Sequence, residues 1–461
     1  MRSDLVLGGP RELGSVALVA GLSGLYGGVL VTMSSFLAAN DNGGSAGAVL
    51  QVVSVVFILI AVYVAAVVIA NAVDTVLAGR LRQIALLRLL GARAAGLRRS
   101  VMAGVGLIGS LCSLAGAAVG VLLADILRVV LVAHGHLAHQ HYAVTSGWVV
   151  VPVLAVGAAS TVAGWVGSRG VLRVSAAAAM SGTTGADPGA GRVTRLRSVT
   201  SLTLIATGAV LLVAAALLGE TASLGGFLLA FFGSATASTG LLVGARMVIP
   251  GLVSVTSRIL GSSPEARIAG RNALKDPLRT TRSTMGLVIG VTLVTTFASG
   301  LGALRRSVDS WPDTTAAQRA QAHHAIGTTT QVIVAVVVIS SLISAVGFVS
   351  TMSLTVIQRR REIGLLRALG FTPRQVRRMI TLESAALSAT AVVFGMALGL
   401  VFGSVGAQSL VGRFTTGFVW GLPWPVLAAT AVGALALVLA AARPPARRAV
   451  RVTPVEALRV D

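Results

Sequence analysis

The feature that most constrains this chain is an arginine-rich segment that occurs twice, each time between two apolar stretches. The first copy, from Gly79 to Val101, reads GRLRQIALLRLLGARAAGLRRSV, and the second, from Gln358 to Ile380, reads QRRREIGLLRALGFTPRQVRRMI. At a constant offset of 279, residues 83–99 match residues 362–378 at 8 of 17 positions. A repeat at this distance indicates a duplicated module, so we expect two related halves.

The composition is that of a membrane protein. Of the 461 residues, 55% are hydrophobic and 11% are charged, whereas a soluble domain carries about 25% charged residues. The formal charge of +22 comes from arginines in short blocks between apolar stretches. No basic patch interleaved with aromatic residues is present, so nucleic acid is not an expected partner. The arginine, alanine, valine and glycine content favours a high-GC bacterial genome.

Ten segments are apolar over about 20 residues, the length that a spanning helix needs. We therefore predict an all-α integral membrane protein with ten transmembrane helices. The expected spans are 14–37, 49–77, 101–124, 147–167, 199–219, 224–249, 284–304, 330–357, 381–411 and 424–442. Spans 49–77 and 330–357 exceed the bilayer thickness and are expected to continue as stalks.

The distribution of basic residues predicts the orientation. One set of loops and both termini carry 31 Lys and Arg residues, whereas the loops on the opposite side carry 5. Because basic residues accumulate on the cytoplasmic side, we expect a multi-pass protein of the bacterial cell membrane with both termini in the cytoplasm.

The repeat also predicts the domain organisation. Arg169-Gly-Val-Leu-Arg-Val-Ser175 resembles Arg447-Arg-Ala-Val-Arg-Val-Thr453, so the first four spans correspond to the last four. The expected divisions are a first four-span module over 1–180, a linker and two-span connector over 181–250, and a second four-span module over 251–461.

The second copy of the repeated segment has the local signals of a helix–turn–helix, which we call an elbow. Gly370 suits the left-handed conformation that ends a helix. Thr372 and Gln375 match a capping box, with Pro373 at the first helical position. The first copy has Gly91 at its turn but no capping box, so its elbow is expected to be less sharply defined.

These residues resemble the FtsX-like, MacB-type permease family of ABC transporters. The resemblance lies in Arg360-Arg-Glu-Ile-Gly-Leu-Leu-Arg-Ala-Leu-Gly370, in the tail from Pro445 to Leu458, and in Arg271 to Arg279 before the seventh span. It covers both halves, more strongly the second. The ten-span, two-module form is similar to the permeases of bacitracin-resistance type.

The resemblance implies that each elbow is a coupling helix docked on a cytosolic ABC ATPase, with two ATPase subunits for each permease chain. The residues implied in ATPase coupling are Gln83, Ile84, Leu87, Arg88 and Gly91 in the first copy, and Arg361, Glu362, Ile363, Leu366, Arg367, Gly370 and Phe371 in the second. Glu383, early in the ninth span, matches an acidic position of the family and is the candidate for transmission. Its counterpart in the first half is Gly104.

The chain contains no G-x-x-x-x-G-K-[ST] loop. It is therefore expected to be no enzyme and to bind no cofactor itself, with ATP and Mg²⁺ held by the partner ATPase. The favoured function is ATP-driven export of an amphiphilic drug, antimicrobial peptide or lipid from the bilayer. The alternative is a non-transporting mechanotransmitter or sensor that regulates a cell-wall hydrolase or a signalling partner. The short loops at 38–48 and 305–329 favour the first.

A histidine cluster, formed by His134, His136, His139 and His141, occupies one loop on the side opposite the arginines. This spacing could bind Zn²⁺ or Cu²⁺, but loop histidines are more often solvated polar residues. No metal site is therefore assigned. Asp125 is one of several polar residues near span ends, where pairing with a nearby arginine is the simpler interpretation.

Overall fold

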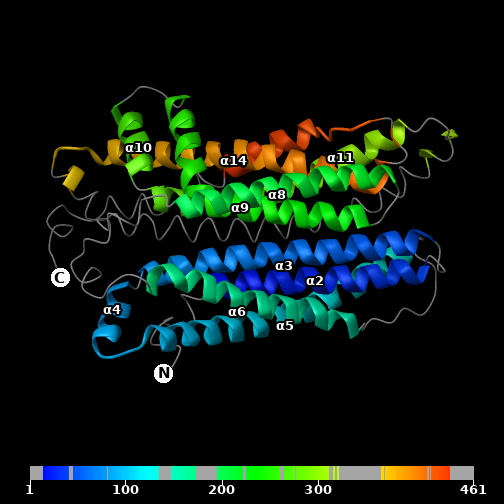
Figure 1. Ribbon diagram of the computed structural model, residues 1–461, viewed down its shortest axis with the longest axis horizontal. Coiled ribbons are helices and arrows are strands. Elements are labelled where there is room, and N and C mark those ends of the chain that lie inside the picture. Colours follow the sequence, from blue (N-terminus) through cyan, green and yellow to red (C-terminus); the bar gives the residue numbers. More distant parts are fainter. Residues whose placement is uncertain are drawn as a thin grey trace. The chain divides into compact units, whose positions relative to one another are not determined.

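The computed structural model describes residues 14–40, 45–79, 81–133, 147–172, 195–221, 225–259, 264–275, 277–310, 315–316, 319–320, 365–367, 369–412, 415 and 417–436. The chain divides into two compact units, Met1–Asp187 and Pro188–Asp461. Over the described residues, the regular elements are helices and no strand occurs (Figure 1). Seven of the described helices are long and apolar enough to cross a membrane. The prediction of an all-α integral membrane protein is confirmed.

The first unit is a bundle of four long helices with a short helix at one end. Its elements are α2 (Gly14–Asn40), α3 (Ser45–Gly79), α4 (Leu81–Leu89), α5 (Ala94–Ala133), the 3₁₀ turn η1 (Gly147–Val149) and α6 (Val150–Leu172). Helix α2 packs chiefly on α5 and α3, and α6 packs on the same two helices. The short helix α4 connects α3 to α5.

The second unit contains the two connector helices and the described part of the second module. Its elements are α8 (Arg195–Glu220), α9 (Gly225–Ile259), α10 (Pro264–Lys275), α11 (Pro277–Asp309), α14 (Pro373–Val411) and a final helix, Trp424–Ala436. Helices α11 and α14 pack along each other, and α8 packs on α9. Helix α10 lies against the beginning of α14 (Figure 1).

Seven of the ten predicted spans coincide with these seven helices. The predicted span 49–77 lies in α3, where the described apolar stretch is the shorter Ile58–Asp74. The predicted span 330–357 lies outside the described residues, and 424–442 is described only as far as Ala436. The number of ten spans therefore stays a prediction.

Small residues allow the two main helix crossings to be close. On α14, a Cβ added at Gly395 would lie 2.9 Å from Val291 Cβ on α11, and one added at Gly399 would lie 2.5 Å from Thr295 Cβ. On α5, Gly116 and Gly120 meet the backbone of α2 in the same way. Spacing of small residues by four positions is typical of tight packing between membrane helices, because it brings the backbones together.

The duplication is visible in this packing. Gly116 and Gly120 are related to Gly395 and Gly399 by the offset of 279 found in the sequence. Helices α5 and α14 also begin at positions 279 apart, Ala94 and Pro373. Each module therefore places its elbow at the beginning of a long helix that crosses the first helix of its own module through small residues.

The connector makes the two modules unequal. Leu398, Phe402 and Val405 of α14 pack in a cluster with α8 and α9. Their counterparts on α5 at the same offset are Val119, Leu123 and Ile126, which are exposed. These large aliphatic side chains suit contact with lipid. Helices α8 and α9 of the predicted connector belong to the same compact unit as α14.

Candidate functional site

The two elbows have the same backbone turn. In the first, the Gly91 amide donates to the Arg88 carbonyl over 3.1 Å, and the Ala92 amide donates to Leu87 over 2.9 Å. In the second, Gly370 and Phe371 donate to the corresponding carbonyls, both over 3.1 Å. This pair of bonds is a Schellman motif, which satisfies the last carbonyls of a helix. Gly91 and Gly370 both have φ of 95°. The first elbow is therefore as sharply turned as the second, contrary to expectation.

Alanine at either glycine is expected to loosen its elbow to the same extent. No atom lies within 4 Å of an added Cβ at Gly91 or Gly370, so the cost is that of the left-handed backbone alone. That cost is about 1–2 kcal/mol. In Gly370→Ala and Gly91→Ala, hydrogen exchange of the amide after each glycine should accelerate by roughly 5- to 30-fold. Gly96→Ala, in α5 with open space around it, should leave both turns unchanged.

The elbows differ at the cap of the following helix, as the sequence predicted. The Gln375 amide donates to Thr372 Oγ1 over 3.3 Å, and the Thr372 amide donates to Gln375 Oε1 over 2.9 Å. These bonds form the predicted capping box, with Pro373 in the first turn. In the first elbow the cap position is Arg93, whose carbonyl accepts from the Leu97 amide over 3.1 Å. Its side chain cannot accept a hydrogen bond.

A capping box transferred to the first elbow is expected to stabilise it. Arg93 and Gly96 correspond to Thr372 and Gln375 at the offset of 279. The double variant Arg93→Thr/Gly96→Gln should stabilise the first turn of α5 by about 1 kcal/mol, and Thr372→Ala should destabilise that of α14 similarly. Hydrogen exchange of the Leu97 and Val376 amides measures both. The control Arg93→Ala removes the arginine without adding a hydrogen-bond acceptor. If the Leu97 amide is as well protected in Arg93→Ala as in the double variant, the capping explanation is contradicted.

Several apolar residues that the sequence assigned to ATPase coupling are buried or half-buried. Ile84 is only 3% exposed, and Leu87 is half-buried. Leu366 and Phe371 pack against a buried cluster that joins α10 to α14 through Ala269 and the first turns of α14. Leu366 and Phe371 therefore have a supporting position, because they fix the second elbow on α10 and α14.

Four leucines outside the assigned set are exposed in the two elbows. Leu86 and Leu90 are 45% and 85% exposed, and their counterparts Leu365 and Leu369 are 54% and 71% exposed. We call these four residues the elbow leucines. Their identity in both copies was visible in the sequence alignment, but only the turn geometry shows which side of the elbow they occupy. An exposed apolar patch at a helix turn indicates an interaction surface.

The remaining assigned residues occupy varied positions. Gln83 is exposed, and Arg88 and Arg367 are half-buried. Arg361, Glu362 and Ile363 lie outside the described residues. Glu383 is buried, with 8% of its surface exposed, three positions after Ile380 of the cluster beside the elbow.

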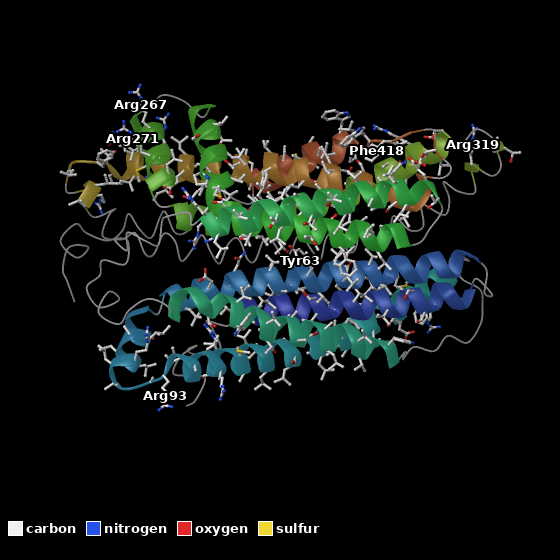
Figure 2. The ribbon with its side chains drawn as sticks, viewed as in Figure 1. Tyr63, Arg93, Arg267, Arg271, Arg319 and Phe418 are labelled. Atoms are coloured by element: carbon white, nitrogen blue, oxygen red, sulfur yellow. The ribbon has the colours of Figure 1, made fainter. Side chains whose placement is uncertain are left out.

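Arginines of the second unit's α10 lie near this elbow. Arg267 and Arg271 are exposed on α10, and Figure 2 shows both at the end of the unit where α14 begins. The opposite side of α10 packs on the elbow through Ile268 and Ala269. The second elbow is therefore bordered by a basic surface that belongs to α10 and not to the repeated segment itself.

The weaker sequence signals have simple outcomes. The Arg128 side chain donates to Asp125 Oδ1 from Nε at 2.8 Å and from Nη2 at 2.7 Å. This ion pair confirms the simpler interpretation of Asp125. The cluster of His134, His136, His139 and His141 lies outside the described residues, and no group of three or more metal-binding side chains occurs among the residues described.

Comparison with known proteins identifies the repeated unit. The family model "FtsX-like permease C-terminal" matches residues 55–176 and again residues 334–454, together more than half of the chain. The two matches begin 279 residues apart, which is the offset of the internal repeat. The chain belongs to the FtsX-like permease family.

Curated relatives match over part of their length. An uncharacterized ABC transporter permease, MJ1507 of Methanocaldococcus jannaschii, is 28% identical over 136 residues, 29% of this chain and 34% of that protein. The ABC transporter permease YtrF of Bacillus subtilis is 37% identical over 73 residues, 16% of each chain. The macrolide export ATP-binding/permease protein MacB of Nitrobacter winogradskyi is 33% identical over 124 residues, 27% of this chain and 18% of that protein. The alignments therefore span about a third or less of these relatives.

Proposed function

We propose that this chain is the membrane subunit of an ATP-driven ABC export system, powered by separate cytosolic ATPase subunits. The observation that carries the proposal is the repeated elbow, with the same Schellman turn and the same pair of exposed leucines in each copy. A rigid turn that presents apolar side chains suits a groove on a soluble partner. Two such turns in one chain suit two ATPase subunits.

The proposed mechanism uses the long helices as levers. Helix α14 runs without interruption over 39 residues from the elbow to Val411, and α5 over 40 residues from the other elbow. ATP binding by the partners would close the ATPase pair and move both elbows. Glu383 would help to transmit this movement, because it is buried close to the cluster that fixes the second elbow.

The proposed substrate is an amphiphile, such as a drug, an antimicrobial peptide or a lipid, taken from the bilayer. The loops at 38–48 and 305–329 offer little extracellular surface for a larger partner, and MacB, one of the relatives, is named for macrolide export. The exposed aliphatic face of α5 would give an amphiphile access along the first module, whereas the connector covers the equivalent face of α14.

The purified complex of the permease with its ATPase, reconstituted in vesicles, tests this function. An amphiphilic antibiotic, a cationic peptide or a fluorescent lipid should stimulate ATP hydrolysis severalfold, and deletion of the gene should lower resistance to that compound. The absence of both effects would contradict export. If a cell-wall hydrolase or histidine kinase co-purifies while no compound stimulates hydrolysis, the protein is instead a non-transporting mechanotransmitter or sensor.

A further inference from the structure

A non-helical segment of the second unit is hydrogen-bonded to two helices far from the elbow. The segment, Gly417–Pro423, follows α14 and precedes the final helix. Figure 2 shows Phe418, within this segment, far from Arg271 and on the side of the unit toward Arg319. Gly421 is buried against α11, where an added Cβ would meet the carbonyl oxygen of Ser299.

Side chains of α11 and α14 hold the backbone of this segment. Ser299 Oγ donates to the Gly421 carbonyl over 2.8 Å, and the Gly421 amide donates to Ser404 Oγ over 3.1 Å. The two hydroxyls are 3.1 Å apart, and both serines have no exposed surface. Non-helical backbone near a bilayer needs such partners, because the hydrocarbon supplies no water to bond a free amide or carbonyl.

Arg306 also holds the backbone of this segment. Its Nη1 donates to the Trp420 carbonyl over 2.8 Å and its Nη2 to the Leu422 carbonyl over 3.2 Å. The planar guanidinium thus bridges two carbonyls on either side of Gly421. A lysine ammonium carries the same charge but lacks this fork geometry.

The position of Arg306 indicates the depth of the segment relative to the bilayer. The predicted span 284–304 is uncharged, and Arg305 and Arg306 are the first charged residues after it. Since charged groups lie outside the hydrocarbon core, the boundary of the core falls at this level of α11. The hydrogen bonds place the carbonyls of Trp420 and Leu422 at the same level.

Three aromatic side chains project from the segment and the residue after it. Phe418, Trp420 and Trp424 are 41%, 50% and 68% exposed, and we call them the aromatic platform. The rings of Phe418 and Trp420 meet edge to face, with centroids 5.0 Å apart. Aromatic side chains, tryptophan above all, concentrate where acyl chains meet lipid headgroups.

We propose that the aromatic platform is a membrane-binding surface seated at the acyl–headgroup boundary, with Arg306 as its positioning residue. The bilayer partner is a phospholipid leaflet on the face opposite the second elbow. The platform fixes the far end of α14, because Ser404 and Gln408 of this helix also bond the segment. The platform supplies a fixed point for the helix that carries the second elbow. The proposal does not depend on the identity of an ATPase or a substrate.

Fluorescence of Trp420 tests the seating. The full chain carries five tryptophans, so Trp148, Trp165, Trp311 and Trp424 are replaced by Phe and the protein is placed in nanodiscs of brominated phosphatidylcholine. Bromine at acyl carbons 6 and 7 should quench roughly twofold more strongly than bromine at carbons 11 and 12. If this variant does not fold, the difference between the native chain and Trp420→Phe gives the same comparison.

Three results decide the proposal. If neither lipid quenches Trp420, the platform lies outside the bilayer, as expected for a protein partner. If the deeper bromines quench more strongly, the platform lies inside the hydrocarbon core. Either result would overturn the proposal. For the positioning role, Arg306→Gln and Arg306→Lys should abolish the preference for the shallow bromines. Arg305→Gln, which removes the same charge one position earlier, should retain it. If the quenching by shallow and deep bromines is unchanged in both Arg306 variants, Arg306 does not position the platform.

Discussion

The double variant Leu365→Glu/Leu369→Glu is expected to lose its ATPase at the second elbow while the permease itself stays folded. Both side chains are exposed, at 54% and 71%, so glutamate costs little in the isolated chain. In an apolar interface, each unpaired charge should weaken association by about 2–4 kcal/mol, roughly 30- to 1000-fold in affinity. Pull-down of the ATPase, together with gel filtration of the permease, measures both effects.

The matched control is Leu366→Glu, one position from Leu365. Leu366 packs against the cluster that joins α10 to α14, so this variant should lower the thermal stability of the permease as well as its association. If Leu365→Glu/Leu369→Glu binds the ATPase like the native chain, and Leu366→Glu does not, the elbow leucines are not the docking surface. Leu366 would then be the ATPase-coupling residue, as the sequence predicted.

Leucine at Gly399 is expected to destabilise the second module severely. A Cβ at this position would lie 2.5 Å from Thr295 Cβ and 2.7 Å from the Thr292 carbonyl oxygen. Since both neighbours are part of α11, the helices must separate, and the cost should reach or exceed the upper end of about 1–3 kcal/mol. Thermal unfolding in detergent and the yield of monodisperse protein measure the effect.

The counterpart Gly120→Leu tests whether the first module depends on the same crossing. A Cβ there would meet the Leu25 carbonyl and lie 3.0 Å from the Val29 amide nitrogen, so a similar loss is expected. Gly433→Leu is the control, because no atom lies within 4 Å of a Cβ at Gly433 in the final helix. A loss at Gly433 equal to that at Gly399 would attribute the effect to helix propensity or insertion rather than to packing.

Much of the fold could be predicted from the sequence because hydrophobic length and internal repetition depend on few assumptions. Seven of the predicted spans are long apolar helices in the structure, and Thr372 and Gln375 form the predicted capping box. The packing of α8 and α9 on α14 could not be predicted, since a lipid-facing and a helix-facing aliphatic residue look alike in sequence. Phe402 and its counterpart Leu123 illustrate this: the first is buried and the second exposed.

The elbow shows the same limit at finer scale. The repeat correctly marked Gly91 and Gly370 as turn residues, because a left-handed residue after a helix favours glycine. It did not separate Leu365, which is exposed, from Leu366, which packs inward. In a short helix next to a turn, the direction of each side chain is set by the neighbouring helices, in this case α10 and α14. The matched leucines of the repeat are conspicuous only once these directions are known.

The number of ATPase subunits bound by one permease chain tests the central claim most directly. Native mass spectrometry of the purified complex should show two ATPase subunits for the native chain. It should show one for Leu365→Glu/Leu369→Glu and one for Leu86→Glu/Leu90→Glu, because each pair belongs to a different elbow. A single ATPase on the native chain, or two retained when either pair is replaced, would contradict the account of two equivalent elbows.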